Sequence, residues 1–159
     1  MPTLDRSQHV SRPPGEAFAF FSDALNLERI TPPWLRFRVT SPEPLEMGPN
    51  TLIEYRLRLH LVPINWLTRI EVWESGRRFV DVQLRGPYRL WEHTHSFEAA
   101  GEGTLMRDVV RYELPLGPAG RLAHRAFVRR DLERIFAFRQ AEVARRLSRS
   151  QSAASGRPV

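Results

Sequence analysis

The hydrophobic period of this chain changes from that of strands to that of a helix near residue 116, and this change limits the fold more than any other feature. From Arg36 to Pro115, apolar and polar residues alternate with a period of two, which is typical of strands with one buried face. Turn signals such as EMGPN, ESGRR and AAGEGT divide the region into segments of strand length. The sequence therefore predicts six antiparallel strands, at 36–42, 51–61, 64–74, 77–85, 88–99 and 104–114.

A long helix is expected after these strands. Over 118–147 the apolar residues recur with a helical period, so one face is committed to burial. This stripe consists of Val128, Leu132, Ile135, Phe136, Val143 and Leu147. Ahead of the strands, residues 4–10 predict an edge strand followed by two short helices. One helix begins near Glu16, and the other, LNLERI, is stopped by Pro32 and Pro33.

This order of elements predicts an α+β fold with two layers. A sheet that buries one face needs a cover, and the last helix is the only expected element large enough to provide it. A strongly curved sheet wrapped around one helix leaves a cavity between the layers. Residues 1–148 should form a single domain, because 159 residues are too few for two well-formed cores. Residues 149–159 are rich in serine and lack apolar periodicity, so we expect a disordered tail there.

The composition excludes several classes of chemistry. The absence of cysteine excludes disulfides and thiol nucleophiles, and the absence of lysine excludes Schiff-base catalysis. All 24 basic residues are arginines, and the formal net charge is +6. Because these arginines are spread along the chain, we expect no nucleic-acid partner. The sequence shows neither a membrane-spanning apolar run nor a secretory signal, so a cytoplasmic location is predicted.

Three sequence segments precede the terminal helix: ITPPWLRF at 30–37, FVDVQLRGPYRLWEHTHSF at 79–97 and GTLMRDVVRYELP at 103–115. Together with RIFAFRQAEV in that helix, they resemble the START-like (SRPBCC) helix-grip superfamily, specifically its polyketide cyclase/dehydrase and coenzyme-Q-binding branch, over about residues 4–147. The resemblance implies a curved antiparallel sheet wrapped around a long C-terminal helix. It also implies that the cavity binds an apolar or amphipathic small molecule, while only some members catalyse a reaction there.

Strand alternation divides the residues of the expected strand 88–99 between two faces. One face carries Trp91, His93, His95 and Phe97, and the other carries Glu92. The face with the two large aromatic residues is the better candidate for the interior. Both histidines should therefore point into the cavity, and Glu92 should point away from it.

Two more polar groups are expected inside. On strand 104–114, Asp108 shares a face with Val110 and Tyr112, and pairing with the preceding strand would bring it near the histidines. Arg139 lies in the middle of the apolar stripe of the last helix. On strand 77–85, a count of hydrophobic residues favours burial of the valines and exposure of Asp81.

Charges inside an apolar chamber must be paired, because an isolated buried charge is strongly unfavourable. We therefore predict a polar cluster of Arg139, Asp108 and either His93 or His95. A carbonyl, phenol or carboxylate of a ligand would meet this cluster, while its apolar body rests on the surrounding side chains. The expected ligand-binding residues are Tyr55, Trp66, Trp91, His93, His95, Phe97, Asp108, Tyr112, Phe136 and Arg139.

The same residues allow two sharper interpretations. In a cyclase or dehydrase, Asp108 would orient His93 or His95, which would take a proton from an acidic carbon of an aromatic or polyketide-like substrate. In a metal site, the two histidines and Asp108 would be ligands, but His-x-His is weak evidence without a full ligand set. The sequence predicts passive binding of a hydrophobic ligand, with catalysis as the alternative and with no metal or cofactor.

The basic face of the last helix suggests one further contact. Its arginines would allow transient docking on acidic lipid headgroups during delivery of a ligand, although a solvated helix face explains them as simply. They are Arg125, Arg129, Arg130, Arg134, Arg145 and Arg146. The oligomeric state does not follow from any of these patterns.

Overall fold

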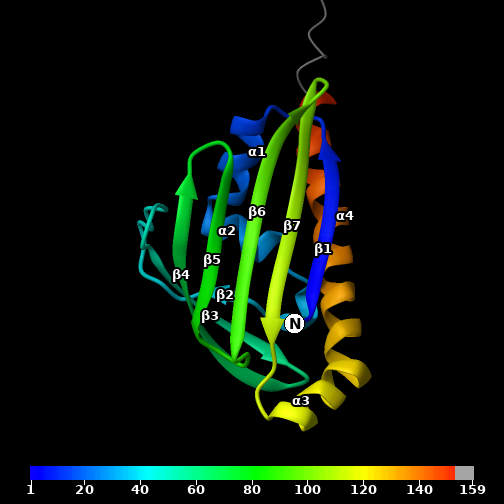
Figure 1. Ribbon diagram of the computed structural model, residues 1–159. Coiled ribbons are helices and arrows are strands. Elements are labelled where there is room, and N and C mark those ends of the chain that lie inside the picture. The colour runs from blue at the N-terminus through cyan, green and yellow to red at the C-terminus, as the bar shows by residue number, and fades with distance from the viewer. Residues whose placement is uncertain (153–159) are drawn as a thin grey trace, which may run out of the picture.

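The computed structural model describes the backbone of residues 1–152 and the side chains of residues 1–148. Within these residues, seven strands form one antiparallel sheet in the order β1-β7-β6-β5-β4-β3-β2 (Figure 1). The predicted α+β class is confirmed. The strands are β1 (Thr3–Val10), β2 (Arg38–Val39), β3 (Leu52–Leu59), β4 (Val62–Glu74), β5 (Arg78–Arg85), β6 (Leu90–Ala100) and β7 (Gly103–Glu113).

Short helices follow β1, and a long helical run follows β7. The helices are α1 (Pro14–Phe21), α2 (Ala24–Arg29), the 3-10 turn η1 (Pro33–Leu35), α3 (Gly117–Ala123), the π-helical segment η2 (His124–Val128) and α4 (Arg129–Ser152). The expected helix at 118–147 therefore consists of three successive pieces. Because α4 continues to Ser152, helix extends past the expected domain boundary at 148, and residues 153–159 of the expected tail lie outside the described residues.

Local sequence explains where these elements begin and end. Pro14 occupies the first turn of α1, where its missing N–H leaves no hydrogen bond unmade. Asp23 caps α2, because its carboxylate accepts a hydrogen bond of 2.9 Å from the backbone N–H of Leu25. The expected strand 36–42 is reduced to the two residues of β2. Pro42 and Pro44 lie three and five residues after β2, and proline cannot donate to a strand ladder.

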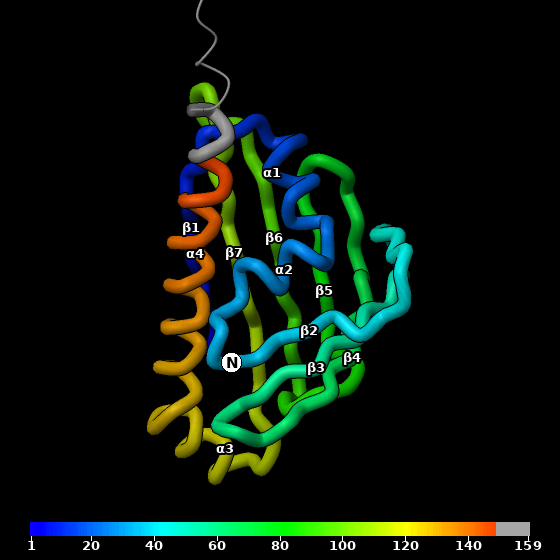
Figure 2. Tube along the Cα trace, turned by 180° about the vertical axis from the view of Figure 1, so that it is seen from behind, coloured from blue at the N-terminus to red at the C-terminus, as the bar shows by residue number. Residues whose placement is uncertain are grey.

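The sheet is strongly curved, and all the helices pack on the same side of it. Figure 2 shows α1, α2 and α4 in front of the sheet, and Figure 1 shows them behind it. Register shifts in β4 near Thr68 and Val72 mark irregularities of the kind that bend a strand. At the β1 edge, Gln140 of α4 accepts a hydrogen bond from Arg6 and its backbone carbonyl accepts another from Gln8. These contacts fix α4 against one edge of the sheet.

Two groups of buried side chains fill the interior. The larger group lies under α1, where Phe18 makes edge-to-face contacts with Phe79 and Phe97. The smaller group joins Val110 and Tyr112 of β7 to α4, and it includes Leu4, Leu132 and Phe136. The two groups leave a space between them in the middle of the sheet. No helix of the described residues is long and apolar enough to span a membrane.

Candidate functional site

A largely apolar cavity of about 160 Å³ lies between the sheet and the helices. An engineered apolar cavity of about 150 Å³ in another protein binds benzene, so this volume suits a single aromatic ring. The sheet contributes Ile53, Tyr55, Leu57, Trp66, Ile70, Phe79 and Trp91 to its wall, and the β5–β6 connection contributes Tyr88. The helical side contributes Phe20, Phe21, Leu27, Ile30, Leu132, Ile135 and Phe136. The chemistry of this lining favours an apolar molecule.

A surface groove adjoins the cavity. Leu35, Leu59 and Ile135 line both spaces, so they separate the groove from the interior. Trp34 lines the outer part of the groove and is half exposed, with its ring edge-on to Phe138. Trp34 therefore belongs to the wall of the groove and not to the wall of the cavity.

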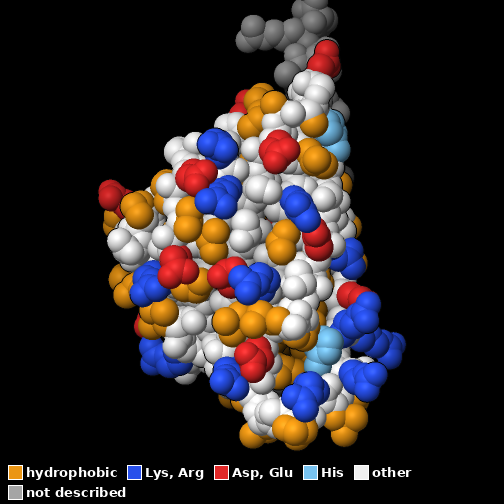
Figure 3. All heavy atoms as spheres, viewed as in Figure 1, with side chains coloured by type: hydrophobic (Ala, Val, Ile, Leu, Met, Phe, Trp, Pro, Cys, Tyr) orange, Lys and Arg blue, Asp and Glu red, His pale blue; other side chains and the backbone are white. Residues whose placement is uncertain are grey.

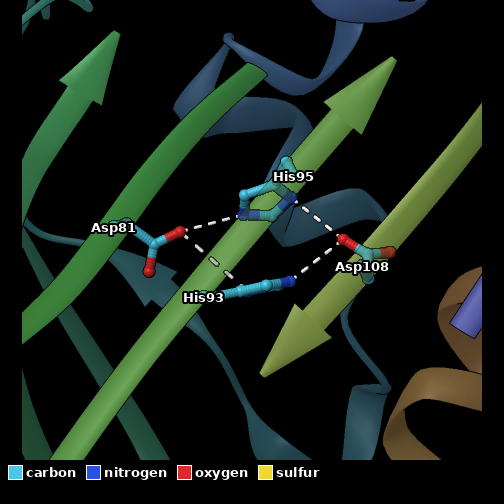
Figure 4. Close-up of polar contacts among 4 residues, drawn as sticks. All are labelled: Asp81, His93, His95 and Asp108. Atoms are coloured by element: carbon cyan, nitrogen blue, oxygen red, sulfur yellow. Dashed lines mark hydrogen bonds and ion pairs between the residues drawn. The ribbon is translucent and has the colours of Figure 1, made fainter. Parts of the chain in front are cut away.

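One wall of the cavity is polar. Three side chains line it and a fourth stands behind them, and together they come from three neighbouring strands (Figure 4). Asp81 comes from β5, His93 and His95 from β6, and Asp108 from β7. The strand register places Asp81 opposite His93 and Asp108 opposite His95. Because directly opposed residues share a face, all four side chains project to the same side of the sheet. We call these four residues the His–Asp cluster.

Short contacts join the members of the His–Asp cluster. His93 Nε2 lies 3.0 Å from Asp108 Oδ1, and His95 Nε2 lies 2.9 Å from Asp81 Oδ2. His95 Nδ1 is also 3.0 Å from Asp108 Oδ1, but without the alignment of a hydrogen bond. His93 Nδ1 is 3.9 Å from Asp81 Oδ2. Each carboxylate therefore touches both imidazoles, and the two rings lie against each other with centroids 3.7 Å apart and planes tilted by 34°.

The two carboxyl groups are ionised at neutral pH. Burial opposes the charge of Asp108, but the contacts with His93 and His95 outweigh it and hold its pKa well below the usual range. Burial likewise opposes the charge of Asp81, and the hydrogen bond from His95 together with nearby positive charge lowers its pKa overall. An ionised carboxylate accepts hydrogen bonds and cannot donate them, so the protons in this cluster sit on the histidines.

The two histidines differ in charge. Burial lowers the pKa of His95, yet its contacts with Asp108 and Asp81 outweigh burial and raise the pKa overall, which favours the imidazolium form. Burial, together with the charge of His95, lowers the pKa of His93 to about 4. At neutral pH His93 is therefore uncharged. Since its Nε2–H donates to Asp108, its Nδ1 carries the lone pair.

Arg139 supplies the remaining charge from α4. Its guanidinium packs over the ring of Phe136 at 5.1 Å and lines the cavity, where it interacts electrostatically with Asp81. Its Nη1 is buried and has no hydrogen-bond partner among the described residues. The positive charges of His95 and Arg139 balance those of the two carboxylates. The wall is neutral overall and presents an unpaired N–H group of Arg139.

The predicted cluster of Arg139, Asp108 and one histidine differs from the arrangement in the structure in its contacts, because both histidines take part and Arg139 is not paired with Asp108. Asp108 is held by the two histidines, and no ion pair between it and Arg139 occurs within the described part of the chain. The expectation that Asp81 is exposed is wrong, since its side chain lies against His95 inside the sheet. On the outer face, Val80 is covered by its cross-strand neighbours Val72 and Thr94, so it reaches burial without entering the core.

Seven of the ten residues expected to contact a ligand line the cavity: Tyr55, Trp66, Trp91, His93, His95, Phe136 and Arg139. The other three do not. Phe97 packs under α1 against Phe18, and Asp108 lies behind the histidines. Tyr112 is buried in the smaller group, where its hydroxyl lies 2.7 Å from Nε2 of His124. Glu92 points outward and pairs with Arg111, as strand alternation predicts.

The sequence reasoning missed the wall contributed by α1 and α2. Phe20, Phe21, Leu27 and Ile30 line the cavity, although the helix period alone marks them only as buried. Nothing in one sequence distinguishes a side chain that fills a core from one that lines a space. Asp81 was recognisable from its place on the same strand face as Phe79, but the valines on the other face masked that signal.

The His–Asp cluster also brings potential metal ligands together. One donor atom from each of Asp81, His93 and His95 lies within 4.8 Å of the others, and Asp108 stands behind both imidazoles. However, a divalent cation here would have to displace the His95 proton and sit near the Arg139 guanidinium. The present charges already balance, so they give such a cation no excess negative charge to neutralise. The absence of a metal cofactor stays a prediction.

A curved antiparallel sheet that wraps around a long C-terminal helix, with an aromatic-lined cavity between the two, defines the helix-grip class. The family model described as "Polyketide cyclase / dehydrase and lipid transport" matches residues 1–148. The chain therefore belongs to this family, and the predicted resemblance is confirmed. No curated protein matches the sequence.

Solved structures agree with this assignment of the fold. The protein TTHA0849 from Thermus thermophilus is 21% identical with a TM-score of 0.74, covering 98% of this chain and 100% of that one. The Zhui aromatase/cyclase from Streptomyces sp. R1128 is 16% identical with a TM-score of 0.74, over 98% of this chain and 99% of that one. The di-domain ARO/CYC StfQ of steffimycin biosynthesis is 14% identical with a TM-score of 0.73, over 94% of this chain and 51% of that one.

Proposed function

We propose that this protein binds a hydrophobic or amphipathic small molecule in the cavity between the sheet and α4. The observation that carries the proposal is the aromatic cavity with a single polar wall, formed by the His–Asp cluster and Arg139. An aromatic, lipid-like or polyketide-like molecule would bury its apolar body against Trp66 and Trp91. A cytoplasmic location, expected from the sequence, remains part of this proposal.

The polar wall restricts the ligand's functional groups. The unpaired Nη1 of Arg139 is a donor, and it suits a carbonyl or phenolic oxygen. Nδ1 of His93 and Oδ2 of Asp81 are two acceptors 3.9 Å apart, and they suit a hydroxyl group that donates its proton. Because the wall is neutral overall, a neutral molecule with both a carbonyl and a hydroxyl group matches it best.

Native mass spectrometry of protein purified from its own host tests the proposal, because a retained ligand appears as added mass. A matched pair of variants on α2 locates the binding site. Leu27 lines the cavity, whereas Leu25 on the same helix is exposed. Leu27→Trp should fill the cavity and expel the ligand, and Leu25→Trp should retain it. If both variants carry the same added mass as the natural protein, the ligand binds elsewhere.

A second candidate function is a cyclase or dehydrase reaction, and the protonation of the two histidines favours it. Nδ1 of neutral His93 is a free base next to the cavity, and Asp108 holds its ring through Nε2–H. His93 would remove a proton from a carbon between two carbonyl groups. The carbanion would attack a second carbonyl carbon and form a carbon–carbon bond, while the His95 imidazolium protonates the new alkoxide. Protonated His93 would then give its proton to the leaving hydroxyl group while neutral His95 takes a proton from the neighbouring carbon, so that water is lost and both histidines return to their starting states.

Affinity and turnover separate the two candidates. If Asp108→Asn and His95→Ala abolish turnover while ligand affinity stays nearly intact, the enzyme interpretation gains support. If both variants only weaken binding, passive binding stands. His9→Gln is a suitable control, because His9 is exposed on β1 and hydrogen-bonds the backbone carbonyl of Ala100, away from the cavity. This variant should leave affinity and turnover unchanged.

A further inference from the structure

One end of the molecule exposes large apolar side chains. The turn between β3 and β4 lies beside α3 in both views of the chain (Figures 1 and 2). Figure 3 shows hydrophobic side chains at this lower end, with arginines next to them. We call this surface the hairpin–α3 patch. It consists of Leu61, Val62, Leu116, Leu122 and Phe127 with Arg58, Arg121, Arg125 and Arg130.

The exposure of these apolar residues is extreme. Leu61 is 86% exposed, Leu116 is 79% exposed, and Leu122 and Phe127 are 69% and 65% exposed. Single exposed leucines are common, but several gathered at one end of a domain usually mark an interaction surface. The π-helical segment η2, which carries Phe127, adds a backbone feature that is frequent at functional sites.

The backbone at two of these leucines is strained. Leu61 has a φ of 70° and Leu116 a φ of 72°, both in the left-handed region. Glycine or asparagine adopts this conformation more easily, and either would also suit water better than leucine. Both leucines occupy the tips of connections, where the fold requires no apolar side chain. Contacts within the described residues bury little of either side chain, so an apolar partner outside the chain would account for leucine at these two positions.

The arginines of the patch lack acidic partners. Among the described residues, no carboxylate forms an ion pair with Arg58, Arg121, Arg125 or Arg130. Residues 117–135 contain five arginines and two acidic residues, a net charge of +3. This positive charge would repel the same patch of a second copy of the chain. It would attract a surface that is both apolar and negatively charged.

We propose that the hairpin–α3 patch docks the protein on an anionic lipid membrane. The leucines and Phe127 enter the boundary between headgroups and acyl chains, and the arginines contact lipid phosphates. This proposal narrows the surface expected from the sequence. Arg145 and Arg146 pair with Glu142 near the far end of α4, so they do not belong to the docking surface.

The position of the patch connects docking with the cavity. Leu59, next to the β3–β4 turn, lines both the cavity and the adjoining groove. His60 in the turn pairs with Asp131 of α4 across this groove. A docked molecule would therefore present the groove to the membrane. The docking proposal itself depends only on the patch and holds whether or not the cavity binds a ligand.

Vesicle co-sedimentation of the full chain tests docking. We expect binding to vesicles that contain phosphatidylglycerol, weak binding to pure phosphatidylcholine vesicles, and loss of binding at high salt. The triple variant Leu61→Ser, Leu122→Ser, Phe127→Ser should reduce partitioning by about tenfold or more. Leu52→Ser, Leu84→Ser, Leu105→Ser is the matched control, because these leucines are exposed on other parts of the sheet. The control should bind like the natural protein.

The charge contribution is tested in the same way. Arg58→Gln, Arg121→Gln, Arg125→Gln should reduce partitioning by about tenfold or more. Arg77→Gln, Arg145→Gln, Arg146→Gln removes the same charge at the opposite end of the molecule and should have little effect. Equal losses in the two variants, or no sedimentation of the natural protein with either type of vesicle, would overturn the proposal.

Two further measurements separate the competing explanations. If the natural protein is a dimer by analytical ultracentrifugation, and the apolar variant is a monomer while neither binds vesicles, the patch is a contact between copies and the docking proposal is wrong. Native mass spectrometry of the same variants reports on the cavity. Vesicle binding without a cavity ligand would contradict the proposed function alone, and a retained ligand without vesicle binding would contradict docking alone.

Discussion

Acidification between pH 6.5 and about 4 should destabilise the protein mainly through His93. Its pKa is 6.5 when the chain is unfolded and about 4 in the folded state, where burial and the charge of His95 oppose protonation. Over this range the unfolded chain therefore binds a proton that the folded protein does not. The free energy of unfolding must then fall as the pH falls, by about 3 kcal/mol in total.

The other charged groups that face His93 act in different pH ranges. The raised pKa of His95 gives stability that is present below pH 6.5 and is lost as the pH rises through the higher folded-state value. The lowered pKa values of Asp81 and Asp108 give stability that is present above their usual value of 3.8 and is lost below it. Arg139 is the remaining charged group near this wall. Within the His–Asp cluster, His93 therefore accounts for most of the change between pH 4 and 6.5, and the comparison with a His93 variant separates it from other groups that titrate in this range, such as Glu142.

Urea unfolding followed by tryptophan fluorescence measures this effect, provided that the dependence of the free energy of unfolding on urea concentration is the same at each pH. The natural protein should lose about 3 kcal/mol between pH 6.5 and 4, and His93→Phe should lose much less. His9→Gln, which changes an exposed histidine, should keep the natural dependence on pH. Each dependence is measured within one protein, so a lower overall stability of His93→Phe does not disturb the comparison. A flat curve for the natural protein, or the same slope after His93→Phe, would refute the reasoning.

Three other changes test the remaining features of the polar wall. Asp108→Asn should lower the free energy of unfolding at neutral pH by about 3 kcal/mol in urea titrations, because it leaves a buried imidazolium with one carboxylate. Asp5→Asn, which removes the exposed ion pair with Arg107, should lower the free energy of unfolding much less. Equal losses in the two variants would show that the buried cluster stabilises the protein no more than a surface ion pair. Arg139→Met should lower the melting temperature of the empty protein, because it leaves two buried carboxylates facing one imidazolium, and it should weaken ligand binding at least about tenfold, since Nη1 has no partner within the described residues. Stoichiometric metal by elemental analysis, or a lower melting temperature in chelator, would contradict the prediction of a metal-free site.

Strand period was sufficient to predict the inner face of β6. The alternation of Trp91, His93 and His95 with Glu92 holds in the structure, because side chains of a strand point to opposite sides regardless of the rest of the fold. The same reasoning placed Asp108 on the inner face of β7. Pairing of consecutive strands then brought it to His95, as expected for two strands joined by a short turn.

Period failed for β5, where both faces carry hydrophobic residues. Val80 on the outer face is buried by Val72 and Thr94, so hydrophobicity did not identify the interior. Asp81 faces inward because His95, on the neighbouring strand, supplies the proton that its carboxylate needs. That compensation depends on which strand lies beside β5 and in which register. Neither property is visible within the strand itself.

The sequence by itself determined the order of elements, the faces of β6 and β7 and the presence of Arg139 on the buried stripe of α4. These follow from local periodicity, which each segment carries in its own residues. Tertiary structure alone decided that Phe97 is covered by α1, that Asp108 is held by two histidines instead of Arg139, and that a space remains beside Trp66. Packing decides these outcomes because the neighbours of a buried group come from segments that are far apart in the sequence. A cavity likewise remains only where the side chains of such segments do not fill the space between them.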